Sequence, residues 1–135
     1  MKIVFYAPLV IVILLFACNS TSDPVVVDDP QDTLIQNLIF FVDTTYLDSN
    51  AKKLVSSGRV KNGGNSKVTS PWYVEGVFYT TKTSNVKLGG ANTRIGVSLN
   101  SNQETIWTLY FTSSNVDVRN YPDFGIKDFR GVYKN

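Results

Sequence analysis

The feature that most constrains the fold is an alternation of apolar and polar side chains, which runs from residue 34 to the end of the chain. Successive side chains of a strand point to opposite faces of a sheet, so this pattern indicates strands with one buried face. No stretch of this region holds the 3.6-residue period of an amphipathic helix. We therefore expect one all-β domain over residues 34–135.

Alternating runs and the turn signals between them predict about seven strands. The expected strands span residues 34–46, 54–61, 72–81, 85–88, 93–99, 105–112 and 124–133. Asn62-Gly63-Gly64-Asn65 is expected to end the second strand and Gly89-Gly90 the fourth, with glycines in turns that need positive φ. No interval is long and helical enough to connect parallel strands, so we predict a single immunoglobulin-like antiparallel β-sandwich.

The alternation also assigns side chains to faces. Six side chains of the third and sixth expected strands should face the core: Trp72, Val74, Phe78, Trp107, Leu109 and Phe111. The opposite faces then carry Tyr73, Tyr79 and Tyr110. Because these strands are neighbours in an immunoglobulin-like order, we predict that the three tyrosines form an exposed aromatic patch for a ligand. The alternative is that tyrosine simply favours strands and covers sheets in general.

Composition limits the chemistry that the chain can perform. It has no histidine and a single cysteine, which excludes a histidine-dependent triad and a cysteine-cluster metal site. With 13 basic and 11 acidic side chains, the net charge of +2 does not indicate a nucleic-acid partner. No metal site or cofactor is predicted, although Asp117, Asn120 and Asp123 offer oxygen ligands in what is otherwise read as a polar loop.

Glu75 and Glu104 are the only glutamates of the chain. Both fall in expected strands and could lie on one sheet. A glycosidase needs two carboxylates about 5–9.5 Å apart, so a hydrolase using this pair is one hypothesis. The alternative is that both are solvated surface residues, which is the usual state of an isolated glutamate on a strand.

The N-terminal segment has the form of a secretory signal peptide, which we predict over residues 1–17. Lys2 precedes an apolar run that is shorter than the roughly 20 residues needed to span a bilayer, and Pro8 interrupts it. The run ends in Leu15-Phe16-Ala17-Cys18, which resembles a bacterial lipobox. The resemblance implies that Cys18 is diacylated through its sulfur and anchors the mature chain to a membrane. The alternative is an ordinary signal peptide whose cysteine stands there by accident.

Residues 18–33 are predicted to be a lipidated, acidic, flexible tether. They contain four aspartates, two prolines and no basic residue, whereas the region from residue 34 onward has a surplus of basic residues. The residue after the cysteine is Asn19, and the lipobox resemblance implies that the absence of aspartate there favours the outer membrane of a Gram-negative cell. We therefore expect a location in the bacterial cell envelope.

The domain also resembles a known family. Residues 57–64 resemble the opening of FxLYD-type domains, in which a G-x-V-x-N strand and turn precede a V-x-V-x-F-Y strand. Residues 73–79 look like the second of these elements, and residues 99–107 look like a later turn and strand. The resemblance covers about residues 54–112 and implies an immunoglobulin- or fibronectin-like sandwich in a surface-exposed prokaryotic protein. It implies no catalytic residues.

Together these features predict a non-enzymatic cell-envelope lipoprotein that displays a β-sandwich for binding or structural support. The expected partners are the membrane, through Cys18, and an envelope protein or a glycan. A second hypothesis is a carbohydrate-binding accessory lipoprotein of a surface glycan system, which would use Tyr73, Tyr79 or Tyr110. The hydrolase using Glu75 and Glu104 is the third.

Overall fold

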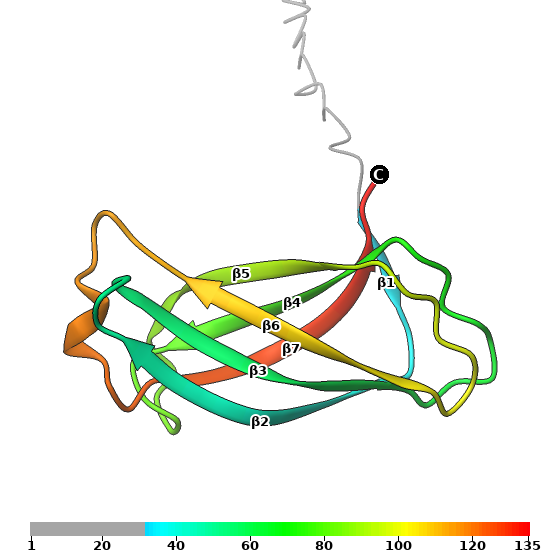
Figure 1. The fold of residues 1–135 in the computed structure, drawn as a ribbon, viewed down its shortest axis with the longest axis horizontal. Coiled ribbons are helices and arrows are strands. Elements are labelled where there is room, and N and C mark those ends of the chain that lie inside the picture. Colours follow the sequence, from blue (N-terminus) through cyan, green and yellow to red (C-terminus); the bar gives the residue numbers. More distant parts are fainter. Residues whose placement is uncertain (1–31) are drawn as a thin grey trace, which may run out of the picture.

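The computed structural model describes residues 32–135, so the signal peptide, Cys18 and nearly all of the tether lie outside the described residues. Within them the chain forms seven strands and one short 3-10 helix, labelled in Figure 1. The elements are β1 (Thr33–Ile35), β2 (Leu38–Asp48), β3 (Lys53–Asn62), β4 (Trp72–Tyr79), β5 (Lys87–Ile95), β6 (Glu104–Phe111), η1 (Val118–Asn120) and β7 (Gly125–Tyr133). Residues 32–135 contain no helix that could span a lipid bilayer.

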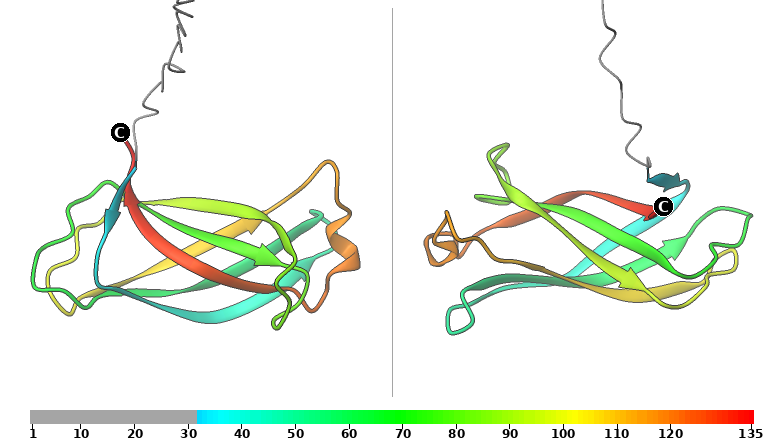
Figure 2. Two further views of the ribbon diagram at one scale, coloured as in Figure 1. Left: turned by 180° about the vertical axis from the view of Figure 1, so that it is seen from behind. Right: turned by 90° about the horizontal axis from the view of Figure 1, so that it is seen from above.

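The strands form two antiparallel sheets, which pack face to face in the views of Figure 2. Sheet A has the order β1-β7-β4-β5, and sheet B has the order β2-β3-β6. The predicted all-β antiparallel sandwich is confirmed. In immunoglobulin-like terms, β2, β3 and β6 take the places of strands A, B and E, while β4 and β7 take those of C and F. The last strand of an immunoglobulin domain, strand G, lies beside strand F. Here β1, the first strand of the described residues, takes that position beside β7.

The expected first strand is divided in two. A turn at residues 36–37 separates β1 from β2, and Asn37 there has a φ of 61°. Asparagine tolerates this left-handed conformation better than most residues, which makes the reversal possible without a glycine. As a result β1 pairs with β7 through Thr33–Ile35 opposite Gly131–Tyr133, while β2 crosses to sheet B.

The fourth and fifth expected strands form one strand, because β5 continues through Gly89-Gly90, and it ends at Ile95, short of the expected residue 99. The prediction that this pair stops a strand is wrong, as is the prediction of positive φ: among the described residues no glycine has one. Gly89 is required for a different reason. A Cβ there would lie 2.5 Å from Cε2 of Phe111, because the ring of that residue packs against the strand.

The core lies between the sheets, where the predicted inward residues are buried. Trp72, Val74 and Phe78 of β4 meet Trp107, Leu109 and Phe111 of β6, and the rings of Phe78 and Phe111 stack with centroids 5.5 Å apart. Each large apolar side chain contributes roughly 1.5–3 kcal/mol through burial. Burial of Trp72 and Trp107 therefore contributes strongly to the stability of the sandwich. The side chains on the outer faces of the sheets do not take part in this core.

Candidate functional site

The three tyrosines predicted to form one patch lie on different faces of the sandwich. Tyr110 is on the outer face of sheet B and is 55% exposed. Tyr73 is half-buried on the outer face of sheet A, and Tyr79 is only 4% exposed, beside a register shift at the end of β4. The prediction that their strands are neighbours is wrong, because β4 belongs to sheet A and β6 to sheet B.

The outer face of sheet B is unusually apolar. It carries five of the nine large apolar side chains that are exposed within the described residues. We call this group the apolar face: Ile39, Phe41, Tyr46, Ile106 and Tyr110. Register places Tyr46 and Tyr110 on either side of Val55, and Phe41 and Ile106 on either side of Arg59. The side chain of Ile106 is 76% exposed, although burial is the usual state of isoleucine.

A compact ion-pair network crosses the apolar face. The Arg59 guanidinium lies 3.0 Å from a carboxylate oxygen of Asp43 and 3.5 Å from one of Glu104. The hydrogen bond from Arg59 is the main reason that the pKa of Asp43 is lowered. The guanidinium also lies over the ring of Phe41, 5.2 Å from its centroid. Arg59 is thus held in one orientation at the centre of exposed apolar side chains.

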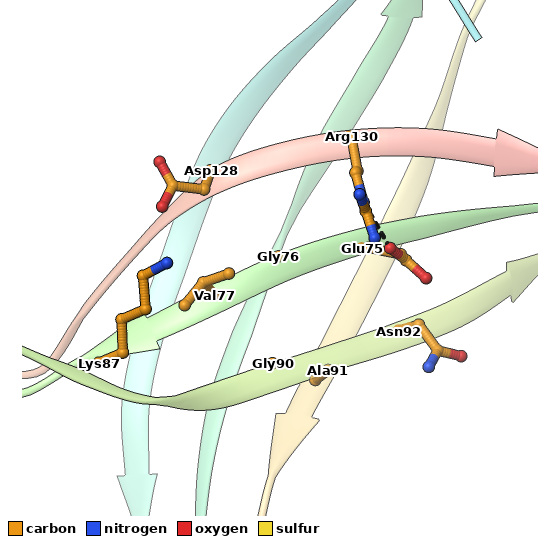
Figure 3. Close-up of a pocket in the computed structure, with 9 residues that line it drawn as sticks. All are labelled: Glu75, Gly76, Val77, Lys87, Gly90, Ala91, Asn92, Asp128 and Arg130. Atoms are coloured by element: carbon orange, nitrogen blue, oxygen red, sulfur yellow. Dashed lines mark hydrogen bonds and ion pairs between the residues drawn. The ribbon is translucent and has the colours of Figure 1, made fainter. Parts of the chain in front are cut away.

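The outer face of sheet A is basic and contains an open depression, shown in Figure 3. Its floor is the side chain of Val77 and the backbone of the small residues around it. Charged and polar side chains surround the floor: Glu75 and Arg130 on one side with Asn92, and Lys87 and Asp128 on the other. The larger basic face also carries Arg94, Lys127 and Lys134.

Glu75 is the best-buried carboxylate of this face, with a side chain only 16% exposed. Its oxygens lie 2.6 Å from Nε of Arg130 and 3.0 Å from Nζ of Lys134. Burial raises the pKa of Glu75, but the hydrogen bonds and charges of these two cations outweigh it, so the pKa lies below its usual value. Glu75 is therefore an anion that fixes two cations in place.

Asp128 is held on the other side of the depression by the hydroxyl of Tyr79, which donates a hydrogen bond to it. This bond to a carboxylate raises the pKa of Tyr79, since the neutral phenol is the donor. The ammonium of Lys127 lies 4.4 Å from the centroid of the same ring. Tyr79 is thus a supporting residue under the basic face and does not present its ring to solvent.

The two glutamates do not share a cleft. Glu75 lies in the depression of sheet A, whereas Glu104 lies on the outer face of sheet B beside Arg59. The expectation that they lie on one sheet is wrong, because their strands belong to opposite sheets. Glu75 and Glu104 therefore do not form the carboxylate pair that such a hydrolase requires.

The loop that offered oxygen ligands is organised around an ion pair. Asp117 accepts hydrogen bonds from the backbone and side chain of Arg119, and these lower its pKa to about 2. Among residues 32–135, no group of three or more acidic, histidine or cysteine side chains is placed to hold a metal ion.

Comparison with known proteins gives no match: no family model, no curated protein and no solved structure is similar to this chain. The resemblance to FxLYD-type domains and to the lipobox therefore stays a prediction.

Sequence reasoning missed both surface features. It singled out Tyr110, but it did not join Phe41, Tyr46 and Ile106 with it into one surface. That joining needs the register between β2, β3 and β6. It missed the depression because reading Gly89-Gly90 as a turn concealed that Gly90 lies opposite Val77.

Proposed function

We propose that this chain is a non-enzymatic lipoprotein of the bacterial cell envelope that displays its β-sandwich to bind another protein. Cys18 would anchor it, the acidic tether would hold the domain away from the membrane, and the apolar face would make the contact. The observation that carries this proposal is the concentration of exposed large apolar side chains on one sheet. Exposed large apolar side chains that gather on one face of a folded domain commonly mark a contact site.

The composition of the apolar face favours a protein partner. Aromatic residues and arginine are enriched in protein interfaces, and an arginine surrounded by apolar contacts is a frequent centre of binding energy. Arg59 holds that position here between Phe41 and Ile106. The partner we expect has an apolar patch with a hydrogen-bond acceptor at its centre, which would meet the guanidinium.

A carbohydrate partner is the second candidate, and Tyr46 and Tyr110 are the observation that favours it. Both are exposed on the same face and flank one residue of β3. Exposed tyrosine rings can stack on sugars. We favour a protein because Ile39 and Ile106, which make up much of this surface, offer no such stacking face.

Site-specific photocrosslinking in cells tests the proposed contact. A photoreactive amino acid at position 106 of the full chain should give one discrete crosslinked protein. The matched control is position 97, since Val97 is an exposed apolar side chain outside the apolar face. The Ile106→Ser variant of the full chain should bind the purified captured protein at least about ten-fold more weakly than the unchanged chain does. This is the loss expected at the centre of an interface. Equal products from both positions would refute the contact.

The proposed anchor has a separate test. Growth with a radiolabelled fatty acid should label the full chain, and Cys18→Ser should abolish the label and release the chain from the membrane fraction. A labelled Cys18→Ser variant would contradict the anchor. Neither result affects the test of the apolar face, so the two parts of the proposal can fail separately.

A further inference from the structure

The depression on sheet A exists because one outward position of β5 has no side chain. Gly90 lies opposite Val77 of β4, and a Cβ built on it would have no neighbour closer than the Gly76 carbonyl oxygen, 3.8 Å away. Its φ is not positive, so no backbone strain demands glycine there. By contrast, the Cβ of the adjacent Gly89 would press into the core. Gly90 therefore leaves open a space that almost any other residue would fill.

The polar groups around this space include unused hydrogen-bond donors. Within the described chain, the side chains of Lys87 and Asn92 make no hydrogen bond or ion pair, although both line the depression. Arg130 bonds to Glu75 through Nε alone, so its terminal amino groups keep their donor capacity. These donors stand around an apolar floor, the pattern of small-molecule sites that combine an apolar surface with a few fixed polar groups.

The two carboxylates of the depression are engaged but not saturated. Glu75 is bound by Arg130 and Lys134, and Asp128 by the Tyr79 hydroxyl. A carboxylate has about four acceptor positions, so each retains capacity for a hydroxyl donor from a ligand. The site thus offers acceptors for hydroxyl groups, the ammonium of Lys87, which lacks an anion, and the free terminal amino groups of Arg130.

We propose that this depression binds a carboxylate-bearing sugar, such as a hexuronate unit of an acidic glycan. The ligand carboxylate would pair with Lys87, its hydroxyls would donate to Glu75 and Asp128 and accept from the free edge of Arg130, and its flatter face would lie on Val77 and the Gly90 backbone. A neutral sugar would leave the Lys87 charge unmatched. An acidic peptide would match the charge but would bring its carboxylates towards Glu75 and Asp128. This site is separate from the apolar face and does not depend on the function proposed for it.

Binding measurements on the full chain in detergent micelles test the proposal. The probes are tetramers of galacturonate and of mannuronate, together with the methyl ester of each, which removes only the charge. At least one acid tetramer should bind, and its ester should bind about ten-fold more weakly, the typical loss for one charge-assisted hydrogen bond. Added salt should weaken the acid form more than the ester.

Three variants locate the site. Gly90→Leu should abolish binding by filling the space, and Lys87→Ala should weaken it about ten-fold. Lys61→Ala is the matched control, since it removes a lysine from the outer face of sheet B and should change nothing. Because Gly90→Leu could disturb folding, Lys87→Ala against Lys61→Ala keeps the test decisive.

Several results would overturn the proposal. They are the absence of binding by both acid tetramers, equal binding of acid and ester, equal losses in the Lys87 and Lys61 variants, and tighter binding of a poly-glutamate peptide. The last would show a general basic surface and not a sugar site.

Discussion

Sheet A and sheet B expose different kinds of side chain to solvent, although their inner faces form one core. The outer face of sheet A has five basic side chains and two carboxylates around a hollow. That of sheet B has three basic and three acidic side chains, with exposed apolar residues between them. Alternation along each strand makes this possible, because the side chains that build the core leave the opposite face unconstrained. This difference is the basis of the two separate contacts that we propose.

The largest expected effect on stability is a difference between the inward and the outward side chains of β6. Trp107→Ala should lower the free energy of unfolding by about 3–5 kcal/mol, because it empties a buried aromatic position. The adjacent Ile106→Ser should change it by no more than about 0.5 kcal/mol. Urea unfolding followed by fluorescence measures both. A large loss in Ile106→Ser would mean that the apolar face supports the fold.

The next effect separates the two adjacent glycines of β5. Gly89→Ala should destabilise the domain by about 1–3 kcal/mol, because its Cβ would overlap the ring of Phe111. Gly90→Ala should leave stability unchanged or raise it by up to about 1 kcal/mol, since open space receives the methyl group. Thermal unfolding of the two variants decides between them. Similar losses in both would contradict the open space over Gly90.

A smaller difference in stability is expected between variants of Tyr79 on sheet A and Tyr110 on sheet B. Tyr79→Phe removes the hydrogen bond to Asp128 and should lower the unfolding midpoint measurably. Tyr110→Phe removes a hydroxyl from an exposed ring and should cost nothing measurable. Chemical denaturation of the two conservative variants, side by side, measures the difference. A larger loss in Tyr110→Phe would reverse the roles that we assign to these residues.

The smallest effect concerns acid stability. Because the pKa of Glu75 is lowered in the folded state, its contribution is complete above its unfolded pKa near 4.5 and is lost as pH falls through the folded pKa. In Glu75→Gln the free energy of unfolding should therefore fall less steeply below about pH 4.5. The difference from the unchanged chain should be roughly 1 kcal/mol or less after screening. The more exposed Asp43 should give a smaller change in Asp43→Asn. Unfolding midpoints measured from pH 3 to pH 6 test this order.

The sequence predicted whichever features depend on local alternation. The inward set of Trp72, Val74, Phe78 and Trp107 was correct because a period of two is a property of each strand alone. The partners of each strand were not predictable in the same way. Whether β6 lies beside β4 or beside β3 is decided by packing between distant segments, and the wrong assignment united tyrosines that lie on opposite faces.

The glycines show the same limit for the candidate sites. Gly89-Gly90 has the composition of a turn, yet it lies within a continuous strand. A Cβ at residue 89 would overlap Phe111, and a side chain at residue 90 would fill the depression. Asn37 turns the chain without any glycine. In each case the reason for the residue lies in a contact with another segment, which neither composition nor periodicity contains.

The position of β1 has a mechanical consequence. The strand by which the described domain begins is held to β7 by three paired residues, whereas ten pairs join β2 to β3. A pull on the chain upstream of residue 32 would load this short strand first. Peeling it away as far as Asn37 would release roughly 20 Å of chain while leaving β2 to β7 folded. The domain thus has a built-in extension that yields before the rest of the sandwich bears the load.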